Sequence, residues 1–203
     1  MREVVLATGN QGKIAEIAAI MEGLPVSFIT RDQMPPWQEI VESGDTYLEN
    51  ALIKARALVE FYGKPALADD SGIEIDALEG APGVRSARFA GPGASDEDNN
   101  HRMAELLTGV PAEKRTARYR CVAVLVLPDG TVLDAEGTCE GRIALAPEGD
   151  NGFGYDPWFI PAEQPEGQGL TFGMLPLEFK HGISHRGKAL RALAEKMATL
   201  GLT

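Results

Sequence analysis

The segment Ala68-Asp69-Asp70-Ser71-Gly72 constrains this chain most, because it places two adjacent carboxylates between apolar runs. Pro65-Ala66-Leu67 precedes it, and the run from Ile73 to Leu78 follows it. Like charges at adjacent positions repel and both need solvation, so such a pair at a strand end is poor for stability. Carboxylates there suit a divalent cation, which takes oxygen ligands and activates a water beside it. The segment therefore predicts a metal site, to which Asp69 and Asp70 contribute, at the end of a strand.

The same pair has a plainer interpretation, in which an Asx-type turn follows a strand and both acids are exposed. The small residues Ser71 and Gly72 and the flanking apolar runs weaken that interpretation. In the catalytic interpretation, a carboxylate there also accepts a proton from the attacking water. Glu42, before Ser43-Gly44 in an acid-rich loop, is a candidate for a further metal ligand. From the residues alone, a solvated loop charge is the favoured interpretation of Glu42.

A second segment, Thr8-Gly9-Asn10-Gln11-Gly12-Lys13, lies where an expected first strand, Val4 to Ala7, turns into a helix. Gly9 permits a tight turn, the helix start offers unpaired N–H groups, and Lys13 adds a point charge for phosphate. The segment matches neither a Walker A sequence nor a GxGxxG fingerprint. An ordinary strand-to-helix turn with Lys13 in solvent explains it about equally well.

Two later segments carry ring-binding and hydrogen-bonding groups. Gly152-Phe153-Gly154-Tyr155-Asp156-Pro157 combines glycines, two aromatic rings and an acid, so that a flat ring could stack there while Asp156 accepts hydrogen bonds. The more frequent outcome is that the aromatics of such a turn pack into the core. Ser184-His185-Arg186 starts a helix, where such residues are usually surface groups or caps. Lys180 is by itself indistinguishable from a solvated lysine.

Composition limits the class of protein. The 203 residues suffice for one domain with a sizeable core, and the formal net charge of −11 argues against sequence-independent binding to a nucleic-acid backbone. A local phosphate site remains compatible with that charge. With no apolar run of about 18 residues and an acidic, short N-terminal run, we expect neither a transmembrane helix nor a signal peptide, and hence a cytoplasmic protein. Cys121 and Cys139 are expected to be buried free thiols.

Hydrophobic periodicity predicts a mixed-sheet α/β architecture, because helices and strands alternate at first and a hairpin follows. Thr46 to Glu49 has the spacing of a capping box at a helix start, and Ser95 is expected to cap a helix to about Leu107. The Asp129-Gly130 turn separates two β-forming runs, which is the clearest hairpin signal. Further expectations are a helix after Gly12, strands over Val26 to Thr30 and Asp156 to Ile160, an ordered loop over 80–94, and a last helix from about Ser184.

Taken together, these segments resemble the Ham1/RdgB family of noncanonical purine nucleoside triphosphate pyrophosphatases, also called inosine triphosphate pyrophosphatases. The resemblance covers the chain from residue 4 to about 190. Any one matching motif is a weak indication, whereas six in the expected order are highly specific. The matching pieces are Thr8-Gly-Asn-x-x-Lys13, Glu49-Asn50-Ala51 with Lys54-Ala55, Ala68-Asp-Asp-Ser-Gly72, Gly83 with Ser86-Ala87-Arg88, Gly152-Phe-Gly-Tyr-Asp-Pro157 and Ser184-His-Arg186.

The resemblance implies an elongated mixed sheet flanked by helices, in a single pyrophosphatase domain over residues 1–203 whose two lobes surround a central cleft. It implies Mg²⁺-dependent hydrolysis of ITP, dITP and XTP to the monophosphate and pyrophosphate, which removes these nucleotides from the pool. It also implies a homodimer. We expect a purine nucleoside triphosphate as the substrate, and neither nucleic acid nor a membrane as a partner.

By residue, the resemblance makes Asp70 the catalytic acid, which acts as proton acceptor and as a carboxylate of the metal site. We expect Asp69, Asp70 and Glu42 to share the Mg²⁺. Many members of the family have two consecutive acids before the glycine that corresponds to Gly44, whereas this chain has Glu42 alone. The implied substrate contacts are Thr8, Gly9, Asn10, Gln11, Gly12 and Lys13 for the triphosphate, with Ser71, Phe153, Gly154, Tyr155, Asp156, Lys180, His185 and Arg186 for the rest of the nucleotide.

The sequence leaves alternatives open for the selection of the base and for the function. A donor such as Arg186 can meet the 6-oxo group of hypoxanthine or xanthine, where adenine presents an amino group, but this does not reject GTP. A different metal-dependent phosphatase, built on the same acidic pair, would release orthophosphate instead. A nucleotide-binding sensor would bind ITP with Mg²⁺ and leave it intact. The identity of the products separates the three functions.

Overall fold

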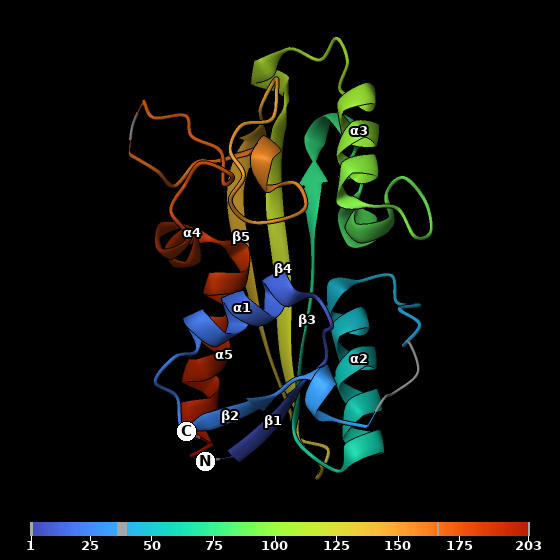
Figure 1. Cartoon of the computed structure of the whole chain (residues 1–203), viewed down its shortest axis with the longest axis vertical. Helices are drawn as coiled ribbons and strands as arrows, with labels where there is room; N and C mark the ends of the chain where they lie inside the picture. Colours follow the sequence, from blue (N-terminus) through green and yellow to red (C-terminus); the bar gives the residue numbers. More distant parts are fainter. Residues whose placement is uncertain (1, 36–39, 166, 203) are drawn as a thin grey trace. The chain divides into compact units, whose positions relative to one another are not determined.

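The computed structural model describes residues 2–35, 40–165 and 167–202 (Figure 1). These residues form a mixed sheet and helices in the α/β class that the periodicity predicts. The strands are β1 (Arg2–Leu6), β2 (Val26–Ile29), β3 (Ala66–Ile75), β4 (Thr116–Val126), β5 (Val132–Ile143) and β6 (Phe159–Pro161). The α-helices are α1 (Gln11–Ile20), α2 (Tyr47–Tyr62), α3 (Asp96–Leu106), α4 (Leu177–Ile183) and α5 (His185–Thr199).

The strands are hydrogen-bonded in the order β2-β1-β3-β4-β5-β6. β1 is parallel to both β2 and β3, whereas β6 is antiparallel to β5. The expected turn at Asp129-Gly130 connects β4 to β5, and the amide of Gly130 donates to the carbonyl of Leu127 over 3.0 Å. The sheet is therefore mixed, as expected. Among the described residues, no helix is both long and apolar enough to cross a membrane.

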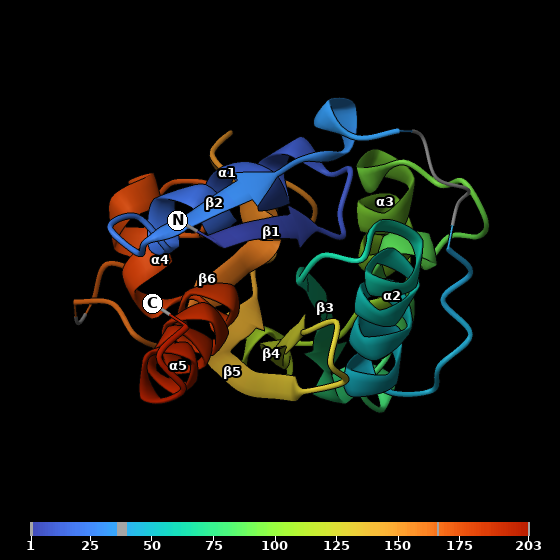
Figure 2. The same ribbon diagram turned by 90° about the horizontal axis from the view of Figure 1, so that it is seen from below.

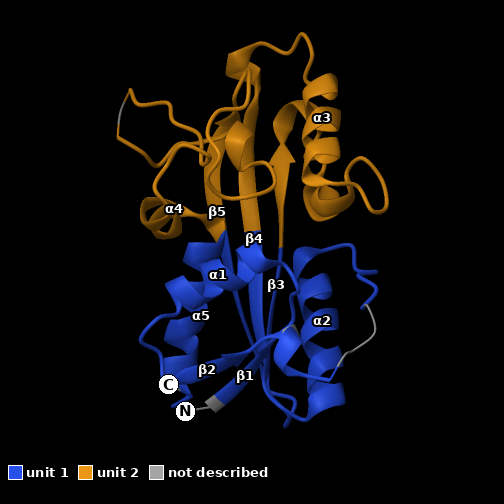
Figure 3. Cartoon of the chain, viewed as in Figure 1, with its two compact units in different colours: residues 1–70, 121–137, 186–203 blue, residues 71–120, 138–185 orange. Residues whose placement is uncertain are grey.

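The chain divides into two compact units (Figure 3). Unit 1 comprises Met1–Asp70, Cys121–Gly137 and Arg186–Thr203, and unit 2 comprises Ser71–Arg120 and Thr138–His185. Strands β3, β4 and β5 each contribute residues to both units. Each unit has its own cluster of buried apolar side chains.

Unit 1 buries its core between the sheet and the helices α1 and α5. Ile17 and Met21 contribute from the α1 side, and Leu190 and Leu193 from α5. They pack with strand residues that include Leu6 and others of β1, β3 and β4. Helix α2 lies on the other side of β3 from α1 and α5 (Figure 2). Consequently β3 has helices on both of its faces within this unit.

Helix α2 begins and ends where its sequence signals predict. The Thr46 side chain accepts from the amide of Glu49, and the Glu49 carboxylate accepts from that of Thr46, which completes the capping box. Gly63 ends the helix in the left-handed conformation, with φ of 64°. Ser95 and Asp98 form a second capping box at the start of α3, which confirms that predicted helix.

Unit 2 has a more aromatic core. The ring of Tyr119 packs edge-on against Phe159, with centroids 4.7 Å apart, and lies at 6.0 Å from Phe172. Cys139 lies in this cluster, whereas Cys121 lies in the core of unit 1. Both cysteines are buried free thiols, as predicted.

Two predicted strand boundaries are wrong, and one helix was not predicted. The acidic pair does not end a strand, because β3 continues from Ala66 to Ile75 straight through it. The strand expected from Asp156 begins at Phe159, since Pro157 lies in a short 3₁₀ turn that precedes it. Helix α4 was not expected at all. It has only seven residues, and it exposes the apolar Leu177 and Phe179 while it buries the charged Lys180, so hydrophobicity does not mark its buried face.

The continuation of β3 into unit 2 depends on Gly72. A Cβ at this position would overlap the carbonyl oxygen of Gly83 and lie 2.6 Å from Oγ of Ser86. We therefore predict that Gly72→Ala lowers the free energy of unfolding by about 2 kcal/mol or more, through overpacking. Chemical denaturation measures this change.

Gly182→Ala in α4 is the matched control, because a Cβ there meets nothing within 4 Å. Alanine in a helix is favoured over glycine by up to about 1 kcal/mol, so this variant should be as stable as the wild type or slightly more stable. Equal losses in the two variants would contradict the packing explanation.

Candidate active site

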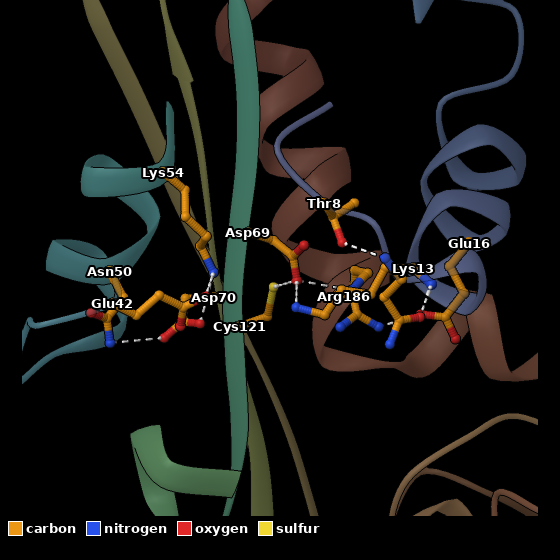
Figure 4. A network of polar contacts seen from close by, with 11 residues as sticks. Thr8, Lys13, Glu16, Glu42, Asn50, Lys54, Asp69, Asp70, Cys121 and Arg186 are labelled. Carbon is orange, nitrogen blue, oxygen red and sulfur yellow. Dashed lines mark hydrogen bonds and ion pairs between the residues drawn. The ribbon is translucent and has the colours of Figure 1, made fainter. Parts of the chain in front are cut away.

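Asp69 and Asp70 are consecutive residues of β3, so their side chains point to opposite faces of the strand. Asp69 points toward α1 and α5, and Asp70 points toward α2 (Figure 4). Their exposed fractions are only 2% and 6%. The interpretation as an exposed turn is therefore wrong, and each buried carboxylate needs compensation on its own side.

On the first side, Asp69 binds two cationic side chains. Its Oδ2 accepts from Nζ of Lys13 over 3.0 Å and from Nε of Arg186 over 3.2 Å. Arg186 also pairs through Nη1 with Glu16, which lies three residues after Lys13 on the same face of α1. Sγ of Cys121 lies 3.9 Å from the same oxygen of Asp69. Two cations and two carboxylates therefore balance within a buried cluster.

The pKa values of this cluster follow from burial and from that pairing. Burial alone would raise the pKa of Asp69, but Lys13, Arg186 and Lys54 outweigh it and hold that pKa well below its usual range. Burial lowers the pKa of Arg186, yet Asp69 and Glu16 outweigh burial and raise it. Burial and the charge of Asp69 raise the pKa of Cys121 to about 12. Asp69 is therefore ionised and Cys121 is a protonated thiol.

Side chains of the expected phosphate loop accept hydrogen bonds from the loop's own backbone amides. Oγ1 of Thr8 accepts from the amide of Asn10 over 3.1 Å, and Oδ1 of Asn10 accepts from the amide of Lys13 over 3.0 Å. Asn10 thus caps α1, whose exposed first turn includes Gln11 and Gly12. First-turn amides have no partner within the helix, and the helix dipole there favours an anion. Since Nζ of Lys13 is bonded to Asp69, the interpretation as a solvated lysine is wrong.

On the second side of β3, Asp70 and Glu42 face the same ammonium group. Nζ of Lys54 lies 3.0 Å from Oδ1 of Asp70 and 3.2 Å from Oε1 of Glu42. Nδ2 of Asn50 donates to Oδ2 of Asp70 over 3.4 Å. Asn50 and Lys54 lie one helical turn apart on the buried face of α2. Glu42 is therefore more than the solvated loop charge that the residues alone favoured.

The loop that carries Glu42 is fixed to α2 through Gly44. The amide of Gly44 donates to Oδ1 of Asn50 over 2.8 Å. A Cβ at Gly44 would lie 2.6 Å from Cβ of Glu49 and 2.8 Å from Oδ1 of Asn50. A glycine therefore suits this close approach of the loop to α2. Through its two hydrogen bonds, Asn50 holds both the loop and Asp70.

Burial raises the pKa of Asp70 above its ordinary value, although Lys54 and Lys13 oppose that shift. Burial lowers the pKa of Lys54, but Asp70, Asp69 and Glu42 outweigh it and raise that pKa. Lys54 is therefore charged, and Asp70 is more basic than a carboxylate in water. A more basic carboxylate suits a proton acceptor.

The described residues contain no group of three or more His, Cys, Asp or Glu side chains that could hold a metal ion. Asp70 and Glu42 nevertheless converge on one cation, the ammonium of Lys54. Mg²⁺ is commonly held by one or two carboxylates together with substrate phosphates. The two carboxylates fit a Mg²⁺ that arrives with a phosphate substrate. Asp69 points away from them, and its Oδ2 already binds two cations.

Unit 2 contains a second buried polar cluster, centred on Asp156. Nζ of Lys180 lies 2.7 Å from Oδ2 of Asp156, the amide of Phe153 donates to the same oxygen over 2.9 Å, and the Tyr119 hydroxyl donates to Oδ1 over 3.3 Å. The exposed fraction of Lys180 is 2%, so its interpretation as a solvated lysine is wrong. Gly152 has a φ of 80°, and a Cβ there would overlap the Asp156 carboxylate. The glycine-rich segment is thus shaped around Asp156.

The aromatic residues of that segment have different surroundings. Tyr155 is buried in the core, and its hydroxyl donates to the carbonyl of Ser86 over 2.8 Å, as the core interpretation predicts. Phe153 is only half-buried, and Nζ of Lys180 lies 5.2 Å from its ring centroid. Gly154 donates its amide to Asp96.

Ser184, His185 and Arg186 are all buried, so their interpretation as surface groups is wrong, although Ser184 does cap the C-terminal end of α4. The ring of His185 stacks on Tyr119, with centroids 4.5 Å apart and planes 6° apart. Ser71 is half-buried in β3. Each of the two clusters thus gathers predicted residues that are far apart in sequence.

Sequence reasoning assigned no role to Asn50, Lys54, Glu16 or Cys121. The first two carry a usable signal, because they are polar residues spaced by four on a helix face that otherwise buries Ala51 and Ala55. Buried polar side chains on such a face need partners, so they mark a site. Glu16 and Cys121 carry no comparable signal, since only the folded chain brings them to Asp69 and Arg186.

The structure is therefore that of an α/β protein in which β3 carries buried carboxylates on both faces, one beside a capped helix start and one paired with a lysine. Residues 4–196 match the family model described as the Ham1 family. The chain belongs to the Ham1 family.

Relatives match along nearly the whole chain. A dITP/XTP pyrophosphatase of Nitratidesulfovibrio vulgaris is 51% identical over 198 residues, which cover 95% of this chain and 94% of that protein. A dITP/XTP pyrophosphatase of Geobacter sulfurreducens is 46% identical over 202 residues, with 100% of both chains covered. The structure of a HAM1 protein from Coxiella burnetii superposes with a TM-score of 0.84 at 40% identity, covering 98% of this chain and 100% of that one. The fold is therefore that of the family.

We predict that Asp69→Asn lowers the free energy of unfolding by about 3 kcal/mol, because it leaves the buried Arg186 and the half-buried Lys13 without their carboxylate. The pKa of Asp69 lies below its unfolded value, so its contribution is present above about pH 4 and is lost as the pH falls through the folded pKa. Denaturation at neutral and acidic pH should show a difference from the wild type that shrinks only in acid.

The matched control is Glu3→Gln, which removes a carboxylate of the same unit from an exposed pair with Lys64. Its stability should stay within about 1 kcal/mol of that of the wild type. An Asp69→Asn variant as stable as this control would contradict the assignment.

Proposed function

We propose that this protein hydrolyses noncanonical purine nucleoside triphosphates (dITP, XTP and ITP) to the monophosphate and pyrophosphate with Mg²⁺. Membership of the Ham1 family supports a nucleoside triphosphate pyrophosphatase, as do relatives named dITP/XTP pyrophosphatase that are 43–51% identical to it. The dependence on Mg²⁺ and the use of ITP are finer proposals. A homodimer in the cytoplasm is the setting that the family resemblance suggests.

The chemistry of this proposal depends on one observation. The side chains of Asp69 and Asp70 lie on opposite faces of β3. Asp70 lies with Glu42 around a cation, while Asp69 binds Lys13 at the start of α1. One face of β3 therefore offers carboxylates for a metal and for a proton. The other face fixes a lysine beside a helix start that favours phosphate.

In the proposed reaction, a water attacks the triphosphate, a new P–O bond forms, and the anhydride between the α- and β-phosphates breaks. Asp70 accepts the proton of that water, as its raised pKa favours. Lys13 and the first-turn amides of α1 stabilise the charge that develops on the departing pyrophosphate. When bound, Mg²⁺ supplies charge neutralisation of the phosphates and polarises the water. Asp70 and Glu42 would hold it.

Asp69 has a different proposed role from that of a metal ligand. Its Oδ2 is bonded to both Lys13 and Arg186 on the face of β3 opposite to Asp70. We propose that it holds the Lys13 ammonium in place for the phosphates. Nε and Nη1 of Arg186 are likewise engaged, by Asp69 and Glu16. Through Asp69, Arg186 therefore supports Lys13.

In unit 2, we propose that Phe153 and the residues around Asp156 contact the nucleotide. The half-buried ring of Phe153 suits stacking, and Lys180 and Asp156 are fixed donor and acceptor groups. Tyr155 and His185 support this cluster through their contacts with Ser86 and Tyr119. We therefore propose that these groups select the base, because buried contacts fix their positions.

The first prediction is the identity of the products. ITP, dITP, XTP, GTP and ATP are incubated separately with the protein and Mg²⁺, and the nucleotides and phosphates are resolved by chromatography. We expect IMP, dIMP or XMP together with pyrophosphate, and little turnover of GTP and ATP. Orthophosphate with a nucleoside diphosphate would establish the phosphatase alternative. Binding of ITP without turnover would establish the sensor.

The second prediction concerns Asp70. Asp70→Asn removes the proton acceptor and a proposed metal ligand, so kcat for ITP should fall by at least about 10²-fold. Circular dichroism should show an unchanged fold, because Lys54 keeps Glu42 as its partner.

Glu22→Gln, which removes an exposed carboxylate of the same unit, should leave kcat unchanged. Near-normal turnover by Asp70→Asn would remove Asp70 from the catalytic role.

A further inference from the structure

Lys54 occupies the position at which the two proposed metal ligands converge. Its Nζ lies 3.0 Å from Asp70 and 3.2 Å from Glu42, on the side of β3 that faces α2 (Figure 4). The exposed fraction of Lys54 is 8%, so its ammonium depends on these carboxylates for compensation. The ammonium therefore already fills the role of a cation at this site.

A magnesium ion held by Asp70 and Glu42 would compete with this ammonium for the same two carboxylates. Mg²⁺ binds carboxylate oxygens at about 2.1 Å, closer than an ammonium does, and accepts little distortion of its octahedral geometry. With Lys54 in place, an incoming Mg²⁺ meets a like charge within a few ångströms in a partly desolvated site. The present contacts of Lys54 therefore oppose the binding of a metal ion between these carboxylates.

We propose that Lys54 is the resident cation of the Asp70–Glu42 site and that Mg²⁺ binds by displacing its ammonium from these carboxylates. The inference rests on the proposed function, which makes Asp70 and Glu42 the metal ligands. Lys54 is thus a positioning residue that keeps the two carboxylates together in the metal-free protein. It also weakens the binding of metal in the absence of nucleotide, because the displaced positive charge then lacks a phosphate partner.

The other contacts of Asp70 and of the Glu42 loop do not involve Lys54. Asn50 holds Oδ2 of Asp70 and, through the amide of Gly44, the loop that carries Glu42. These contacts use atoms other than Oδ1 of Asp70 and Oε1 of Glu42, which bind Lys54. Asp70 and the backbone of the loop that carries Glu42 consequently keep these contacts when the ammonium leaves.

The test measures the binding of Mn²⁺, as a spectroscopic probe for Mg²⁺, to nucleotide-free protein by electron paramagnetic resonance. It is done near pH 8, above the usual carboxylate range. Lys54→Met is expected to bind Mn²⁺ at least about tenfold more tightly than the wild type, because no like charge must be displaced. Lys54→Arg keeps the charge and is expected to bind no more tightly than the wild type. Lys54→Gln replaces the methionine variant if that variant does not fold.

Lys64→Met is the matched control. Lys64 follows α2 and pairs with Glu3 on the surface of the same unit, so this variant loses one positive charge away from the site. Its affinity for Mn²⁺ should stay within about twofold of the wild-type value. Equal or weaker binding by Lys54→Met, or a gain in Lys64→Met of the same size, would overturn the proposal.

A double variant tests whether the tighter binding of Mn²⁺ occurs at Asp70. Lys54→Met combined with Asp70→Asn should lose the tighter binding, whereas its retention would overturn the assignment of the site. Because the readout uses no nucleotide, a failure of this proposal shows in the binding of Mn²⁺. A failure of the proposed function shows instead in the products of the turnover assay.

Discussion

The pleat of β3 is the constraint on which the candidate site depends. Adjacent residues of a strand face opposite sides, so Asp69 and Asp70 cannot share one environment although they are neighbours in sequence. Both are buried, and a buried carboxylate without a cation is costly. In unit 1, cationic side chains compensate both carboxylates. Lys13 and Arg186 pair with Asp69 on one side of the strand, and Lys54 pairs with Asp70 on the other. The positions of α1, α5 and α2 around β3 follow from these pairings as well as from apolar packing.

The same solution recurs in unit 2, where Lys180 compensates Asp156 and the surrounding donors occupy both oxygens of that carboxylate. Networks of this kind are rigid, because each member has few alternative partners once it is buried. Rigid donors and acceptors suit the recognition of a nucleotide, since a ligand that leaves one of them unpaired is penalised. In unit 2, burial therefore links the stability of the Asp156 cluster to the selectivity proposed for it.

Local signals predicted much of this molecule. The capping boxes at Thr46 and Ser95 and the turn at Asp129-Gly130 lie where expected, because each depends on residues within one turn of chain. The continuity of β3 was missed, because adjacent acids are tolerated inside a strand only when distant cations neutralise them. Many of the residues that the sequence singles out as site candidates lie in the two buried polar clusters, but the sequence does not predict which of them contact one another. Whether Lys13 meets Asp69 or Asp70 depends on which helix covers which face, and no local pattern encodes that.

The binding of Mn²⁺ to Asp69→Asn and Asp70→Asn, compared in nucleotide-free protein, tests the division of the pair most directly. If the strand separates a metal face from a phosphate face, Asp70→Asn loses at least about tenfold in Mn²⁺ affinity, whereas Asp69→Asn retains the affinity of the wild type. An equal loss in both variants would show that the two carboxylates share the ion, and it would contradict the division of the pair by β3.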